Sequence, residues 1–94
     1  MQLNFSPRIL AKLEEKHSIK QKEVFECFFN REHNFLLDTR ENNKTNPATQ
    51  WFISETDKGK KLKICFIPID GELIIKTAYP PSAEEIRIYG KYAV

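Results

Sequence analysis

The sequence predicts an α+β fold in which two N-terminal helices pack on an antiparallel β-sheet and a short helix closes the chain. Ser6-Pro7 is a helix-start signal, because the serine caps the first turn and proline lacks a donor that would be unpaired there. Ser82, with Glu85 three positions later, is a capping box that predicts the closing helix. Between these signals, strand-type segments joined by turn-forming residues predict an antiparallel meander at 50–55, 61–67 and 72–79.

The N-terminal part is predicted to contain a short edge strand at 2–5 and a helical hairpin. The first helix spans 7 to about 17. Ser18, with Gln21 three positions later, predicts a second capping box, so that another helix begins after a very short turn and ends near residue 30 or 31. The apolar residues of the two helices recur at helical spacing and predict their inner sides: Ile9, Leu10, Leu13, Val24, Phe25, Phe28 and Phe29.

A further strand is predicted at 35–37, followed by a polar, Asn-rich segment at 39–48. Turns are predicted at 57–60 and 68–71. Alternate residues of a strand point to opposite faces, so in the middle strand one face is packed and the face of Lys61, Lys63, Cys65 and Ile67 is expected to be partly exposed to water. The closing helix is expected to pack back through Ile86, Tyr89 and Ala93.

Length and composition indicate one small domain, 1–94, with no metal and no cofactor. Lys and Arg number 15 and Asp and Glu number 13, and this net charge of +2 argues against generic coating of nucleic acid. No apolar run reaches the roughly 18–20 residues that span a bilayer, and the N-terminus does not resemble a secretory leader, so we expect no membrane association. Cys27 and Cys65 have neither metal-ligand nor disulfide-framework spacing, which favours a reduced, cytoplasmic setting.

Lysines are concentrated on one predicted hairpin, at Lys58, Lys60, Lys61 and Lys63. Such a cluster can bind phosphates, and Lys76 on the neighbouring strand joins it if the two faces match. Lysines on a solvated hairpin also keep a protein soluble and block edge pairing, and charge pattern alone favours that interpretation.

His17 and Glu55 are candidates for proton transfer. His17 lies where the first helix ends, and the negative end of the helix dipole favours its protonated form. A histidine on an apolar stripe also commonly caps or packs, which spacing alone favours. Glu55 lies beside Lys58 and Lys60, where it can be a surface ion pair or a general base held ionised by the lysines.

Arginine and tyrosine side chains complete the candidate set. Arg40 lies in the polar segment after Asp38, and Arg87 in the closing helix offers a guanidinium to a phosphate. Tyr79 and Tyr89 offer phenols for stacking or hydrogen bonding, although the spacing of Tyr89 is also typical of a core residue. Neither cysteine has the neighbours that a nucleophile requires.

Several short motifs, taken in order and spacing over nearly the whole chain, resemble those of the BrnT toxins. The family opens with Lys-His-Gly-Val/Ile, then Glu-Ala/Val and Phe, and continues with a second strand, an Arg/Lys-Leu-Leu-x-Val-x-Phe strand, an Ile-Ile-Ser-Ala-Arg strand and a Glu-Arg-x-x-Tyr helix. The corresponding residues here are Lys16-His17-Ser18-Ile19, Glu23-Val24-Phe25 and Phe28, Trp51-Phe52-Ile53, Lys61-Leu62-Lys63-Ile64-Cys65-Phe66, Ile74-Ile75-Lys76-Thr77-Ala78-Tyr79, and Glu85 with Tyr89.

The resemblance implies a RelE-like ribonuclease fold in a type II toxin–antitoxin pair, with an RNA substrate cut without metal and an antitoxin protein that covers the active face. It implies that Lys61, with Lys63 beside it, and Arg87 neutralise the phosphate, that His17 or Glu55 transfers a proton, and that Tyr79 or Tyr89 orients the substrate, with the remaining cations Lys58, Lys60, Lys76 and Arg40 binding RNA. The chain departs from the family pattern where the strand arginine is Tyr79, the glycine is Ser18 and the helix arginine is Ile86.

Two other function classes stay open at this point. The same fold can serve as a non-catalytic module that docks a protein partner through its closing helix. An enzyme that processes ADP-ribose or another nucleotide is the third class, although the dispersed acids do not form the Asp-rich two-metal site that ADP-ribosyl hydrolysis would need.

Overall fold

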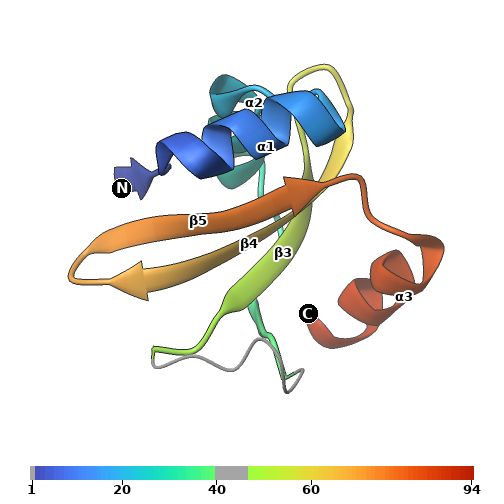
Figure 1. Cartoon of the computed structure of the whole chain (residues 1–94). Coiled ribbons are helices and arrows are strands. Elements are labelled where there is room, and N and C mark those ends of the chain that lie inside the picture. Colours follow the sequence, from blue (N-terminus) through green and yellow to red (C-terminus); the bar gives the residue numbers. More distant parts are fainter. Residues whose placement is uncertain (1, 40–46) are drawn as a thin grey trace.

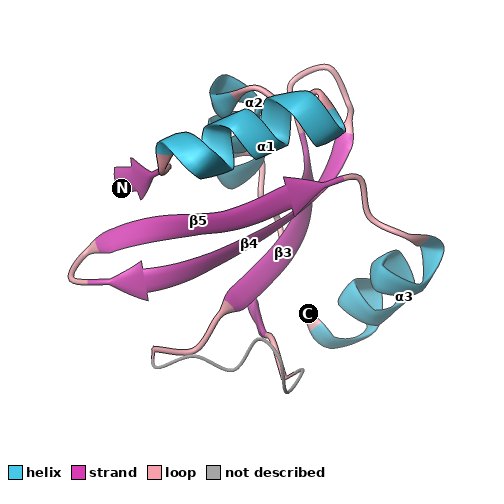
Figure 2. Cartoon of the chain, in the orientation of Figure 1, coloured by secondary structure: helices cyan, strands magenta, loops and turns pink. Residues whose placement is uncertain are grey.

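The computed structural model describes residues 2–39 and 47–94. Over these residues the chain is an α+β structure with three helices and a five-stranded mixed sheet (Figure 1, Figure 2). The predicted order of elements, β-α-α-β-β-β-β-α, is confirmed. The elements are β1 (Gln2–Asn4), α1 (Pro7–His17), α2 (Gln21–Phe29), β2 (Leu36–Leu37), β3 (Gln50–Glu55), β4 (Lys61–Ile69), β5 (Glu72–Tyr79) and α3 (Ala83–Tyr92).

The strands lie in the order β1-β5-β4-β3-β2. The meander from β2 to β5 is antiparallel, as predicted, but β1 pairs in parallel with β5, so the prediction of a wholly antiparallel sheet is wrong. The reason is topological. Tight turns enforce antiparallel pairing only between strands that follow one another, whereas β1 reaches β5 from a distant part of the chain.

Both predicted turns of the meander are present. Asp70 and Gly71 follow β4 with φ of 48° and 81°, the two positive values that a tight hairpin turn matching the twist of its strands requires. Gly59, with φ of 83°, supplies the left-handed residue between β3 and β4. The strand β4 runs to Ile69, two residues beyond the predicted end at 67.

The predicted capping box at Ser18 and Gln21 is wrong. Ser18 ends α1 instead, in a left-handed conformation with φ of 53°, and its N–H donates to the carbonyl of Glu14. The second helix begins after Lys20, whose N–H donates to the carboxylate of Glu23 at 2.9 Å. A chain that reverses directly after a helix needs a left-handed residue there, so Ser18 is not in the extended conformation that an N-cap requires.

The helices α1 and α2 lie on one face of the sheet (Figure 1). Aromatic rings dominate this interface: the ring centroid of Phe28 in α2 lies 4.6 Å from that of Phe52 and 5.5 Å from that of Phe66. Edge-to-face rings at such distances add to the burial of apolar surface, which explains how a small chain forms a stable core.

The other face of the sheet carries α3, through the contact of Tyr89 with Trp51 at 5.6 Å between ring centroids. We expected this face to be partly wet, but Lys63 and Cys65 in its middle are only 4% and 3% exposed. Tyr89 and Ala93 pack back as predicted, whereas Ile86 remains partly exposed. Among the described residues, no helix combines the length and apolar character needed to cross a bilayer.

Candidate functional site

Three polar side chains meet between the sheet and α3. The Nζ of Lys63 lies 2.8 Å from Oε2 of Glu85, and the hydroxyl of Tyr79 donates to the same oxygen at 2.8 Å. Lys63 and Tyr79 are direct cross-strand partners on β4 and β5, so they lie on the same face. Glu85 is held above them by the capping box of α3, in which its Oε1 accepts from the N–H of Ser82 at 2.9 Å. Strand register and helix capping together therefore fix the arrangement.

The electrostatics favour charged Lys63 and Glu85. Desolvation raises the pKa of the Glu85 carboxyl, but hydrogen bonds from Lys63, from the Ser82 N–H and from Tyr79 outweigh it and bring this pKa to about 2. Desolvation lowers the pKa of Lys63, yet its hydrogen bond to Glu85 leaves the pKa above the ordinary value. The pKa of Tyr79 is raised, first by burial and then by donation to Glu85, so its hydroxyl keeps its proton at neutral pH.

Aromatic rings extend the site in both directions. The imidazole of His17, at the end of α1, lies 5.9 Å from the Tyr79 ring, centroid to centroid. On the other side, Nζ of Lys63 lies 4.5 Å from the centroid of Trp51. We call His17, Lys63, Tyr79 and Glu85 the Glu85 cluster; its members come from α1, β4, β5 and α3, four elements that are distant in sequence.

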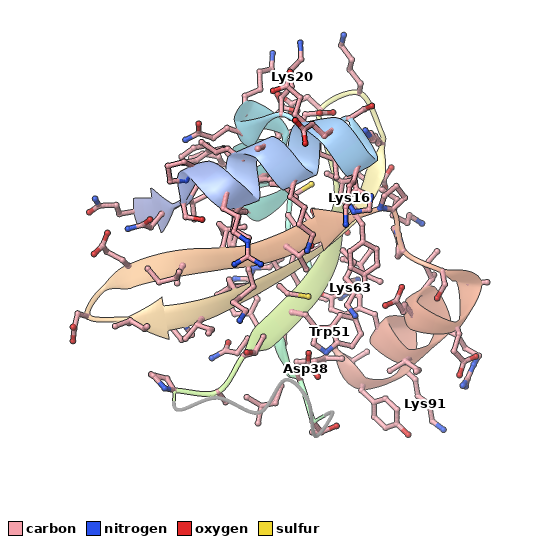
Figure 3. All side chains as sticks on the ribbon, viewed as in Figure 1. Lys16, Lys20, Asp38, Trp51, Lys63 and Lys91 are labelled. Atoms are coloured by element: carbon pink, nitrogen blue, oxygen red, sulfur yellow. The ribbon has the colours of Figure 1, made fainter. Side chains whose placement is uncertain are left out.

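A groove of about 740 Å³ runs from the Glu85 cluster along α3, and we call it the Trp51 groove. Its walls are mostly apolar, and it contains polar groups of both signs: the lining includes Phe35, Leu37, Asp38, Trp51, Lys63 and Tyr92. In Figure 3, Lys63, Trp51 and Asp38 follow one another between the sheet and α3. The volume lies within the range of small-ligand sites.

A second hollow, of about 940 Å³, lies on the opposite side of α3, and we call it the Lys61 hollow. Ile86 and Gly90 of α3 line this hollow, whereas Ile88 and Tyr92 line the Trp51 groove, and residues two apart on a helix point in nearly opposite directions. Its lining includes Arg31, His33, Glu55, Lys61 and Tyr89. Two distinct sites therefore flank the closing helix.

The structure divides the predicted site residues between these two places. His17, Lys63 and Tyr79 meet in the Glu85 cluster, whereas Glu55, Lys61 and Tyr89 line the Lys61 hollow. Tyr89 is a core residue, in agreement with the more conservative interpretation: it is buried and its hydroxyl donates to the carbonyl of Asn34 at 2.9 Å. Burial also raises the pKa of Tyr89.

Arg87 belongs to neither group. Its guanidinium forms two hydrogen bonds with the carboxylate of Glu84, the shorter at 2.6 Å, in a pair exposed to solvent. Because Arg87 is two residues from Glu85, it points away from the side of α3 that faces Lys63. The prediction from the sequence grouped Arg87 with the hairpin lysines Lys61 and Lys63. In the structure, helix geometry directs its side chain away from Lys63.

The remaining cations lie around the rim. Nζ of Lys60 donates to the carbonyl of Ser18 at 3.4 Å, so this lysine caps the end of α1, and Lys58 is exposed. Lys76 is exposed and does not lie opposite Lys63, whose partner on β5 is Tyr79; Lys76 falls where the register of β4 and β5 shifts, between Thr77, the partner of Cys65, and Ile75, the partner of Phe66. Arg40 lies outside the described residues.

Two residues of the site were missed by reasoning from the sequence. Glu85 was assigned as a helix cap and motif residue, and a capping box shows only that one carboxylate oxygen is used locally; the other oxygen is free to bridge to the sheet. Trp51 was assigned to a strand, without a role. The signal available in the sequence was Lys63, a lysine in the middle of the neighbouring strand. Alternation alone predicted that its side chain faces water, and the structure shows it buried.

The described residues were also compared with the requirements of a metal site and of a reactive thiol. Over residues 2–39 and 47–94, no group of three His, Cys, Asp or Glu side chains is placed to hold a metal ion. Burial, followed by the nearby carboxylates, raises the pKa of the Cys27 thiol to about 12, which keeps this thiol protonated at neutral pH.

Comparison with protein-family models gives no match, and comparison with curated proteins gives no significant relative.

Proposed function

We propose that the protein is a metal-independent endoribonuclease of the RelE-like, BrnT-like toxin class, silenced by a cognate antitoxin, and that the Glu85 cluster is its catalytic centre. The observation that carries the proposal is the convergence of an imidazole, an ammonium, a phenol and a carboxylate from four elements. These are the groups that RNA cleavage by the ribose 2′-hydroxyl requires when no metal takes part.

Each group has a role in that reaction. The 2′-oxygen attacks the adjacent phosphorus and the bond to the 5′-oxygen breaks, which leaves a 2′,3′-cyclic phosphate and a 5′-hydroxyl. His17 takes the proton from the 2′-hydroxyl, and Lys63 stabilises the negative charge that develops on the phosphoryl oxygens. Tyr79 donates to the leaving oxygen. Glu85 is a positioning residue, because it holds Lys63 and Tyr79 at 2.8 Å.

The position of Lys63 offers a substitute for the arginine that the toxin pattern has where this chain has Tyr79. The resemblance expects an arginine where this chain has Tyr79, and a leucine where it has Lys63. These two residues face each other across β4 and β5, and both contact Glu85. A cation that is absent at position 79 is thus replaced from the facing strand, at the same carboxylate.

A second candidate function is a non-catalytic module that docks a protein partner. Lys63 is 4% exposed and already bonded to Glu85. A buried ion pair of this kind can have a purely structural role, joining a helix to a sheet, as well as a catalytic one. Leu37 and Tyr92 are exposed apolar side chains that line the Trp51 groove and offer a docking surface.

Incubation of the purified chain with labelled RNA in the presence of EDTA tests the proposal. We expect cleavage that leaves cyclic phosphate ends, and a loss of about 10²-fold or more in rate for His17→Ala, as is typical for removal of a general base. Tyr79→Phe removes only the hydroxyl and should lower the rate while the protein stays folded.

The matched control is His33→Ala, because His33 is the only other histidine and lies at the Lys61 hollow. Cleavage that survives His17→Ala but not His33→Ala would move the centre to that hollow, beside Glu55 and Lys61. Intact RNA together with a tight protein complex would favour the docking module instead.

A further inference from the structure

We infer that Trp51 is a positioning residue for the Glu85 cluster: through a cation–π contact, its indole ring holds the Lys63 ammonium in place and keeps it charged without neutralising it. The inference deepens the proposed function and rests on it, because Lys63 is the cation assigned there to the phosphoryl oxygens. The buried tryptophan then takes part in the reaction through Lys63 rather than by touching RNA.

Trp51 and Lys63 lie on the same face of the sheet, on neighbouring strands. Lys63 faces Ile53 across β3 and β4, and Trp51 faces Cys65, so the tryptophan and the lysine are diagonal neighbours. Diagonal neighbours are within reach of one another when their side chains are aromatic or long. Nζ of Lys63 lies 4.5 Å from the centroid of the indole ring, inside the roughly 6 Å over which an aromatic face attracts a cation. Figure 3 shows the two residues together between the sheet and α3.

The indole ring has a fixed position of its own. It is 8% exposed, and its centroid lies 5.6 Å from that of Tyr89 on α3, whose hydroxyl donates to the carbonyl of Asn34. A ring packed in this way has little freedom to move, so it restricts the lysine that lies over it. Glu85 therefore holds the ammonium from α3, and Trp51 holds it from β3.

The charge of Lys63 needs such support, because the side chain is only 4% exposed. Desolvation lowers the pKa of Lys63, and its hydrogen bond to Glu85 is the main opposing contribution. A cation–π contact favours the same charged form, and it is stronger between groups that are shielded from water.

An aromatic ring suits this position better than a second carboxylate. Lys63 and Glu85 together carry no net charge, so another carboxylate would make the pair negative and repel a phosphodiester. The indole attracts the ammonium through its quadrupole and adds no formal charge. Lys63 is thus stabilised as a cation and keeps its attraction for an anionic substrate.

Fluorinated tryptophan tests the inference directly. Trp51 is the only tryptophan, so a chain produced with fluorotryptophan is changed at this ring alone. Fluorine withdraws electron density from the π face with little change in ring size, so a difluorinated ring attracts a cation less than a monofluorinated one. In RNA cleavage with EDTA, kcat should fall in this order, by about threefold or more over the series, while KM stays within about twofold. A kcat that does not follow the order would overturn the inference.

Lys63→Met is the matched control, because methionine keeps an aliphatic side chain but carries no charge. In urea denaturation followed by circular dichroism, fluorination should lower the midpoint of the chain with Lys63 and leave that of Lys63→Met unchanged. An equal fall in both would assign the effect to the contact of Trp51 with Tyr89, and the inference would be wrong.

Trp51→Phe and Trp51→Leu keep the test decisive even if Lys63→Met does not fold. Both substitutions shorten the side chain, but only phenylalanine retains a π face for Lys63. We expect a lower kcat for Trp51→Leu than for Trp51→Phe. Equal values would contradict a role for the ring electrons.

The two proposals fail in different ways. RNA that is cleaved at a rate independent of fluorination would remove the role of Trp51 and leave the nuclease. Intact RNA, with a urea midpoint that follows fluorination only when Lys63 is present, would remove the nuclease and with it the part of Trp51 in the reaction. The cation–π contact would then remain as a structural interaction.

Discussion

Glu84 and Glu85 are neighbours on α3, yet they occupy opposite environments. Glu84 pairs with Arg87 on its own helix at 2.6 Å, with both side chains more than 60% exposed. Glu85 pairs with Lys63 on β4 at 2.8 Å, with side-chain exposures of 22% and 5% for the glutamate and the lysine. The shorter distance belongs to the pair that matters less, because water screens an exposed pair while burial strengthens the dependence of each charge on its partner.

The difference also concerns what each pair connects. The pair of Glu84 and Arg87 spans one helical turn, which forms without it. The pair of Glu85 and Lys63 joins the closing helix to the centre of the sheet, and Tyr79 shares the same oxygen. A local pair adjusts one element, whereas a long-range buried pair helps to fix the position of α3 and hence the walls of both the Trp51 groove and the Lys61 hollow.

Removal of the lysine should have the largest effect. Lys63→Met keeps the aliphatic stem against Trp51 but leaves Glu85 partly buried without its cation, so we expect a loss of about 2–4 kcal/mol in the free energy of unfolding. Urea denaturation followed by Trp51 fluorescence measures it.

The control for this substitution is Lys61→Met, on the same strand and the same face but exposed. Its free energy of unfolding should stay within about 0.5 kcal/mol of wild type. Equal losses for the two variants would mean that burial of the pair of Lys63 and Glu85 adds nothing to the free energy of unfolding. The different environments of Glu84 and Glu85 would then make no difference to stability.

The pH dependence of stability should show an intermediate effect. The folded pKa of Glu85 is about 2 against an ordinary 4.5, so the folded state holds this proton less tightly than the unfolded state. The resulting stabilisation is complete above pH 4.5 and is lost as the pH falls toward 2. After allowance for solvent at the open edge, this amounts to about 1–3 kcal/mol.

Glu85→Gln isolates this contribution, because all other carboxylates remain in both proteins. The variant should be less stable than wild type at neutral pH, and the gap should narrow between pH 4.5 and 2. Thermal unfolding at several pH values measures the gap. A gap that stays constant over this range would show that Glu85 acts through packing and capping rather than through its charge.

The order of elements was predictable from the sequence because caps, turns and alternation are local. A few neighbouring residues are enough to specify the local structure at Ser6-Pro7, at the capping box of Ser82 and at the Asp70-Gly71 turn. Parallel pairing of β1 with β5 was not predictable in this way, since no local residue encodes the choice of a distant partner. Ser18 shows a limit even at short range, because two local roles competed for one serine.

The site was only partly predictable for the same reason. His17, Lys63 and Tyr79 were candidates by residue type, but their meeting depends on register between β4 and β5 and on the docking of α1. Lys61 and Lys63 look equivalent in the sequence. Only the placement of α3 over one end of the sheet makes Lys63 buried and leaves Lys61 exposed.

The smallest effect is expected for Arg87→Ala. The substitution removes the exposed pair with Glu84 and replaces arginine by a residue with equal or better helix propensity, so the melting temperature should not be separable from that of wild type. The same comparison in high salt adds a second check, because an exposed pair that does contribute loses its contribution as salt rises. A salt-sensitive loss comparable to that of Lys63→Met would show that Glu84 and Glu85 are energetically alike, and the position of α3 would then depend on the surface of the helix as much as on its buried side.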